Sequence, residues 1–200
     1  MRSTTGIFSL LVGFSLLFNI ASASFMLYER DIEPAEIDLQ LITNELDLLD
    51  LDLILLNATQ FNITGPELDA PTLVAQINQE FTTLDQLTLG ASMRVMACFS
   101  ANGPATIEDA DGFIHLAQTG YIPIIEDMLN RTEGLHPFFS KDAANLASLR
   151  NDLRLYNHSN SLYLANLTIA SAPELLPVVR NITANITRAF QETLAVYGLF

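Results

Sequence analysis

Cysteine, basic side chains and histidine are all scarce in this sequence, and each shortage excludes a class of protein. The single cysteine, Cys98, excludes a disulfide within the 200-residue chain, so the fold must depend on its apolar core. A buried inert thiol is the simplest interpretation of Cys98, and a bridge between two chains is the alternative. Nine Lys and Arg against 23 Asp and Glu give a formal net charge of −14, which opposes binding to nucleic acid and to anionic membranes.

Catalytic motifs are also missing. The chain contains no G-x-S-x-G elbow, no H-E-x-x-H sequence and no phosphate-binding glycine loop. Its three histidines, His115, His136 and His158, fall in separate segments. The Glu-x-x-His sequence ending at His136 has no second copy, and the loop before Gly112 has Ile107 at the first calcium-ligand position. We therefore predict a protein that is not an enzyme, with no catalytic residues, no cofactor and no metal.

Only one long apolar run is present, and it has the form of a secretory signal peptide. A basic Arg2 precedes the apolar stretch IFSLLVGFSLLF, and the small residues ASA follow it at 21–23. This pattern predicts residues 1–23 as a signal peptide cleaved near Ala23, with a retained signal anchor as the alternative. No other segment is long enough to span a membrane. The expected organisation is then an N-terminal extension at 24–34 and a single helical domain at 35–200.

Sites for N-glycosylation are unusually frequent in the rest of the chain. The Asn-x-Ser/Thr sequence occurs at seven asparagines: Asn57, Asn62, Asn130, Asn157, Asn166, Asn181 and Asn185. Behind a signal peptide, this number indicates a glycoprotein of a eukaryotic secretory pathway, found outside the cell or in a cell wall.

Glycine and proline gather in a few places, and long periodic segments lie between them. These segments predict five helices, which run at about 34–57, 71–99, 112–130, from about Asp142 and from about Pro173. Pro123 should kink the third helix because proline removes one backbone hydrogen bond and clashes with the preceding turn. The predicted fold class is all-α, an antiparallel bundle of about five amphipathic helices. No segment except the leucine-rich one at 44–59 competes seriously as a strand.

Two of these helices show one apolar face each. The second predicted helix carries a stripe with spacings of three and four: Leu73, Ile77, Phe81, Leu84, Leu87 or Thr88, Ala91, Val95 and Cys98. In the fifth, Asn181, Asn185, Arg188 and Glu192 share a narrow polar face at 100° per residue. Its opposite face is apolar, so two glycosylation sites should point to solvent while the other side packs.

The first predicted helix is apolar on two sides. Its main stripe is Ile42, Leu46, Leu49, Leu53 and Leu56, which we expect in the core. A second strip, Leu48, Leu51 and Leu55, lies roughly opposite, with Asp47, Asp50 and Asp52 on the flanks between. Such a helix is sandwiched in a core, lines a cavity or meets an apolar partner. The candidate contacts for a hydrophobic ligand or surface are Leu48, Leu51, Leu55 and, on the second helix, Phe81.

Four segments of the chain each show a helical packing pattern: LVAQINQEFTTLDQLT, YIPIIEDMLNRTEGLHPFF, ANLASLRNDLRLYNHSNSLYLANL and NITANITRAFQETLAVYG. Together they resemble the fungal hydrophobic surface-binding protein A family, also called the cell-wall galactomannoprotein family. The resemblance covers about residues 35–198. This chain differs from the usual pattern in its leucine-rich first helix, its many glycosylation sites and its lack of a Ser/Thr-rich stalk.

The resemblance implies a non-catalytic, all-helical protein that is secreted or wall-associated. Members of this family adsorb to hydrophobic surfaces and help to recruit secreted hydrolases, or hold fatty acids between their helices. The expected partner is thus a hydrophobic surface or a lipid, together with a secreted hydrolase in the first case. The alternative is a structural wall mannoprotein without a small-molecule ligand.

Overall fold

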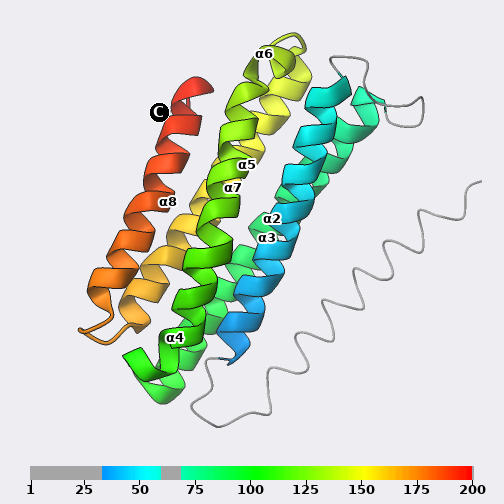
Figure 1. Cartoon of the computed structure of the whole chain (residues 1–200). Coiled ribbons are helices and arrows are strands. Elements are labelled where there is room, and N and C mark those ends of the chain that lie inside the picture. The colour runs from blue at the N-terminus through cyan, green and yellow to red at the C-terminus, as the bar shows by residue number, and fades with distance from the viewer. Residues whose placement is uncertain (1–32, 60–68, 200) are drawn as a thin grey trace, which may run out of the picture.

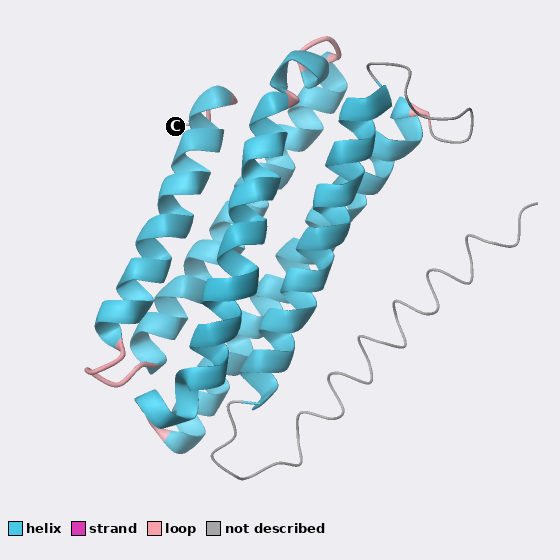
Figure 2. Cartoon of the chain, in the orientation of Figure 1, coloured by secondary structure: helices cyan, strands magenta, loops and turns pink. Residues whose placement is uncertain are grey.

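The structure, a computed structural model, describes residues 33–59 and 69–199, and every long element in these ranges is a helix. The predicted signal peptide and Asn62 lie outside the described residues. The elements are α2 (Glu33–Thr59), α3 (Ala70–Asn102), α4 (Ile107–Leu116), the π-helical turn η1 (Ala117–Tyr121), α5 (Ile122–Gly134), α6 (His136–Phe139), α7 (Ala143–Ala170) and α8 (Leu176–Val196). The all-α prediction is confirmed, and Figure 2 shows helices joined by short loops in the described part of the chain.

The five long helices form two layers (Figure 1). One layer holds α2, α5 and α8, with α5 in contact with both neighbours, and the other holds α3 and α7. Successive long helices run in opposite directions, as an antiparallel bundle requires. Within a layer, however, the helices run in the same direction. The α3 and α7 helices make the most extensive pairing in the molecule although the chain crosses to the other layer between them.

Aspartate residues begin two of the long helices at the expected places. The carboxylate of Asp69 accepts a hydrogen bond from the Thr72 amide at 2.9 Å, and Pro71 occupies the first turn of α3. The carboxylate of Asp142 accepts hydrogen bonds from the amides of Ala144 and Asn145 at 2.8 and 3.1 Å. Both side chains satisfy amides that have no partner within their own helix. Local chemistry therefore defines where these two helices start.

The predicted apolar stripes form the core of the bundle. On α2, Leu46, Leu49, Leu53 and Leu56 are fully buried, as is Ile42. The α3 stripe is buried as predicted from Leu73 to Val95, and on α8 Asn181 is exposed while Ile182 and Ile186 are buried. Among the described residues, no helix is both long and apolar enough to cross a membrane. Helix periodicity thus predicted correctly which faces meet in the core.

The third predicted helix begins a turn earlier and is less regular than expected. It starts at Ile107, continues through Gly112, and passes through η1 before Pro123. Proline has no amide hydrogen, and the Ile122 amide bonds to the Ala117 carbonyl, five residues back. A π-helical turn therefore lies directly before Pro123. Gly112 is suited to the interior of α4 because the Glu36 carboxylate lies against it, where a side chain would stand.

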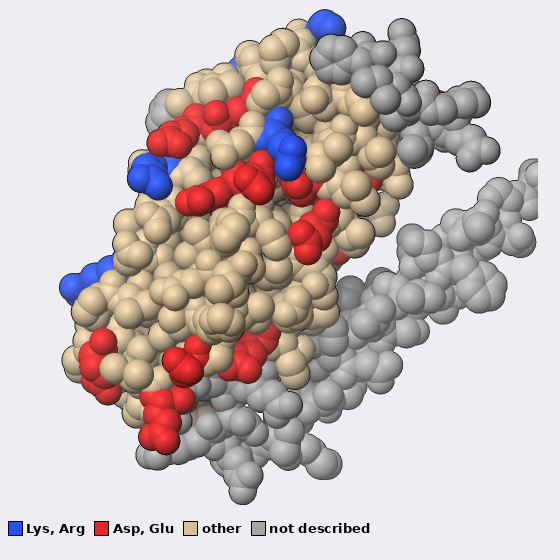
Figure 3. All heavy atoms as spheres, in the orientation of Figure 1, with Lys and Arg blue, Asp and Glu red and all other residues tan. Residues whose placement is uncertain are grey.

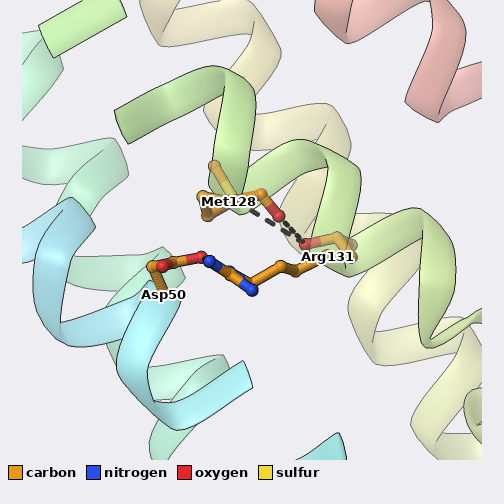
Figure 4. A network of polar contacts seen from close by, with 4 residues as sticks. Asp50, Met128 and Arg131 are labelled. Atoms are coloured by element: carbon orange, nitrogen blue, oxygen red, sulfur yellow. Dashed lines mark hydrogen bonds and ion pairs between the residues drawn. The ribbon is translucent and has the colours of Figure 1, made fainter. Parts of the chain in front are cut away.

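Two arginine–aspartate pairs connect α2 to its neighbours. Arg94 on α3 binds Asp38 through Nε and Nη2 at 2.5 and 2.6 Å, and Asp38 is only 5% exposed. Arg131 on α5 binds Asp50 through Nε at 2.5 Å (Figure 4). This contact is much closer to solvent. The first pair is bidentate and its aspartate is buried, so we expect it to contribute far more to the fold than the second.

Candidate functional site

A small apolar cavity lies at the end of the bundle that carries α4. Its volume is about 130 Å³. The lining comes from the start of α2, the end of α3, α4 and the loop before it, the end of α7, and the segment that enters α8. The lining includes Val95, Cys98, Asn102, Ala110, Phe113 and Ala170.

A short parallel bridge holds the loops at this end together. The Ala105 amide donates a hydrogen bond to the Ala170 carbonyl at 2.8 Å, and the Ala172 amide donates one to the Ala105 carbonyl at 3.0 Å. The bridge connects the α3–α4 loop to the α7–α8 loop, and both loops contribute to the lining. The cavity is therefore framed by backbone contacts between segments far apart in the sequence.

The lining is suited to hydrocarbon. Among the residues of the described ranges that line the cavity, most are Ala, Val, Leu, Ile, Pro or Phe, and none is charged. Its polar side chains are Cys98, Asn102, Thr106 and Ser171, and the Ser171 hydroxyl already donates to the Leu167 carbonyl at 2.7 Å. An engineered apolar cavity of about 150 Å³ binds benzene, so a volume of this order accepts a short hydrocarbon segment.

Cys98 lies in the wall of this cavity instead of the closed core. Its side chain is half-buried, and burial raises the pKa of the thiol further above its usual value. A raised pKa keeps the thiol protonated and weakly reactive at neutral pH. The expectation of an inert thiol agrees with this environment, but the residue is less buried than its helical stripe indicated.

The candidate contact residues predicted from the sequence do not line the cavity. Leu48 and Leu51 are 53% and 50% exposed, respectively, on the outer side of α2, and Leu55 is half-buried against the core. Phe81 is buried and packs edge-to-face on Tyr156, with ring centroids 6.3 Å apart. The structure thus separates these residues: two are available to an external surface, and Phe81 belongs to the core.

A pair of carboxyl groups is held between α2 and α3. Burial and the nearby carboxylates of Asp52 and Glu45 raise the pKa of Glu80 to about 8. Burial also raises the pKa of Asp52, although the hydrogen bond from Glu80 opposes this. This environment favours the protonated form of Glu80 at neutral pH. No group of three or more His, Cys, Asp or Glu side chains in the described ranges is placed to hold a metal ion.

This pair predicts a protein that is more stable in acid. The pKa of Glu80 is higher in the folded chain than its ordinary value of 4.5. The contribution of Glu80 to the free energy of unfolding is therefore fully present below pH 4.5. This contribution is lost as the pH rises from about 4.5 toward about 8. Thermal unfolding followed by circular dichroism should show a melting temperature that falls over this range. Glu80→Gln should flatten the fall, whereas Gln79→Glu on the exposed side of α3 should not; an unchanged slope in Glu80→Gln would contradict the assignment.

The glycosylation sequences occupy different environments. Asn57, Asn130 and Asn181 are exposed on helices, and Asn157 and Asn185 are half-buried. Asn166 is half-buried, and its Nδ2 donates to the carbonyl and the hydroxyl of Ser92 at 3.2 and 2.8 Å. This nitrogen would carry the glycan, so Asn166 is the least suitable of the six described sites.

Two solved structures share this fold. Ligand-binding domain 1 of the Penicillium marneffei MP1 protein, complexed with arachidonic acids, has a TM-score of 0.67 and 12% identity; the match covers 84% of this chain and 98% of that domain. Ligand-binding domain 2 of the same protein, complexed with multiple arachidonic acids, has a TM-score of 0.61 and 14% identity, with coverage of 86% and 98%. No protein-family model and no curated protein sequence matches the chain.

Proposed function

We propose that this protein is a secreted, non-catalytic lipid-binding bundle whose end cavity accepts the hydrocarbon part of a fatty-acid-type ligand. The observation that carries the proposal is an apolar, uncharged cavity in a fold shared with two domains solved with arachidonic acids. Each buried methylene group contributes about 0.8 kcal/mol, so a short chain segment is enough for measurable binding. The resemblance to the hydrophobic surface-binding protein A family supports the same function.

Adsorption to a hydrophobic surface is the second candidate, and the outer side of α2 favours it. Ile37, Leu48 and Leu51 are each at least half exposed and lie on one side of the helix, at spacings of eleven and three residues. This strip would meet the surface, and a secreted hydrolase would be recruited by the adsorbed protein. If neither lipid nor surface is bound, the remaining function is that of a structural cell-wall mannoprotein.

A cavity-filling substitution tests the first candidate. Ala170→Leu places three additional carbons in the cavity wall, and we expect binding of a medium-chain lipid such as octan-1-ol to weaken about tenfold. Isothermal titration calorimetry measures the affinity, and circular dichroism verifies that the fold persists. Ala165→Leu, at an exposed position on the same helix, is the matched control and should bind normally. Equal affinities of Ala170→Leu and Ala165→Leu for octan-1-ol would show that the ligand binds outside this cavity.

We further propose a glycosylated mature chain that starts near Ser24 and folds as one domain from residue 35. Digestion with an N-glycan endoglycosidase should increase the mobility of the secreted protein on a gel. Asn181→Gln should reduce that shift by one glycan, and Asn166→Gln should leave it unchanged because the Asn166 amide is engaged with Ser92. Absence of any shift would remove the glycoprotein assignment, and a lost glycan in Asn166→Gln would show that this contact does not prevent modification.

A further inference from the structure

We propose that the cavity selects lipids whose polar end is uncharged, such as an alcohol or a protonated acid, over the corresponding carboxylate. This inference rests on the proposed lipid-binding function and specifies the chemical class of the ligand. It follows from the charges in and around the cavity.

The described residues that line the interior provide no charged partner for an anion. They include no Lys, Arg or His side chain. Arg94 precedes the lining residue Val95 in the sequence. Its Nε and Nη2 atoms, however, donate hydrogen bonds to the carboxylate of Asp38. A carboxylate that entered would have to compete with an aspartate already in a bidentate pair. The only cation close to the wall on α3 is therefore already neutralised.

The surroundings of the cavity are acidic. Glu36 adjoins the lining residue Ala35, Asp111 adjoins Ala110, and Glu174 adjoins Leu175. Glu108 follows the lining residue Thr106 by two positions and is exposed. Figure 3 shows acidic side chains gathered over the end of the molecule that α4 covers, in the view of that figure. These groups repel a carboxylate as it approaches and leave an alcohol unaffected.

The other titratable and charged groups around the cavity do not reverse this balance. The Cys98 thiol is neutral at neutral pH because its pKa is raised. His115 and Arg180 each follow a lining residue, Ile114 and Val179, and both are exposed to solvent. In the described part of the chain, the residues next to the lining thus include four carboxyl groups and two exposed basic side chains. The field around the cavity thus disfavours an anionic ligand end.

A matched pair of ligands tests the inference on the folded, full-length mature protein. Octan-1-ol and octanoate have the same chain length, and each displaces the neutral fluorophore N-phenyl-1-naphthylamine if it enters the cavity. At about pH 7 we expect the alcohol to bind at least about tenfold more tightly. Near pH 4 the difference should shrink, because the carboxyl group of octanoic acid has a pKa of about 4–5, like that of Glu. The affinity of the alcohol should stay the same.

Asn102→Arg provides a test by gain of binding. Asn102 lines the cavity and is exposed, so the new guanidinium can reach a carboxylate at the opening. At about pH 7 the affinity for octanoate should improve several-fold relative to the affinity of the same variant for octanol. Gln191→Arg on the exposed side of α8 adds the same charge away from the cavity and should change neither.

The outcomes separate this inference from the proposed function. Equal affinities for octanol and octanoate at neutral pH, with no dependence on pH, would overturn the inference and leave lipid binding in place. Failure of both ligands to displace the fluorophore would overturn the proposed function, and the inference with it. An improvement of octanoate binding in Gln191→Arg equal to that in Asn102→Arg would show that overall charge, not the cavity surroundings, controls selection.

Discussion

Leu49→Asp is expected to abolish cooperative folding, whereas Leu51→Asp, two residues away on the same helix, should leave the fold nearly intact. Leu49 is fully buried and Leu51 is half exposed. Burial of one leucine is worth about 1.5–3 kcal/mol, and a buried unpaired charge costs more. The sum is a large part of a total stability of about 5–15 kcal/mol. The two substitutions are chemically identical, so only their position on α2 distinguishes them.

Circular dichroism and thermal melting measure this difference directly. We expect Leu49→Asp and Leu53→Asp to lose the sharp transition, and Leu48→Asp and Leu51→Asp to keep it within a few degrees. The same four variants can be applied to a hydrophobic plate. If the outer strip of α2 adsorbs to surfaces, the two folded variants will bind the plate more weakly. Unfolding of all four variants would show that both sides of α2 are core.

The sequence was sufficient to predict most of the fold because apolar periodicity is a local property. The α2 stripe from Ile42 to Leu56 repeats every three or four residues, and only a helix buries such a stripe on one side. Asp142 and Pro71 likewise indicated helix starts, because an aspartate side chain caps the first turn and the fixed φ of proline suits it. These features need no knowledge of what each helix packs against.

The second strip on α2 shows where periodicity stops being informative. Leu48, Leu51 and Leu55 form a regular strip, but the pattern cannot tell a core contact from an exposed one. In the fold, Leu55 is half-buried against the core and the other two are exposed. Phe81 was predicted as both a core residue and a candidate contact, and tertiary packing places it in the core. Exposure depends on the neighbouring helix, which the local pattern does not identify.

The cavity could not be predicted from local patterns because its walls come from distant segments. Ala35, Cys98, Ala110 and Ala170 meet only after α2, α3, α4 and α7 have packed, and the bridge between Ala105 and Ser171 joins two loops. Small residues at such positions leave space, but the same residues elsewhere allow close helix packing. Ala35, Ala105, Ala110 and Ala170 therefore gave no specific signal on their own.

Arg94→Leu is expected to lower the free energy of unfolding by about 3–5 kcal/mol. The substitution leaves Asp38 buried without its bidentate partner. Arg131→Leu is the matched control, since it removes the other arginine paired with α2. Arg131 is 43% exposed, and its Asp50 partner can be hydrated, so the expected loss is about 1 kcal/mol or less. Chemical denaturation of the unmodified protein, Arg94→Leu and Arg131→Leu under identical conditions measures both losses of stability.

A double variant and a pH series show whether the buried charge causes the loss. Burial already raises the pKa of Asp38 in spite of Arg94, and removal of the arginine should raise it further. The Arg94→Leu variant should therefore recover stability as the pH falls and Asp38 becomes protonated. The double variant Asp38→Leu with Arg94→Leu should recover most of the lost stability at neutral pH. Apolar residues of similar volume often replace a buried pair without a loss of stability. If the double variant is less stable than Arg94→Leu, the pair holds α2 to α3 by geometry that leucine packing does not replace.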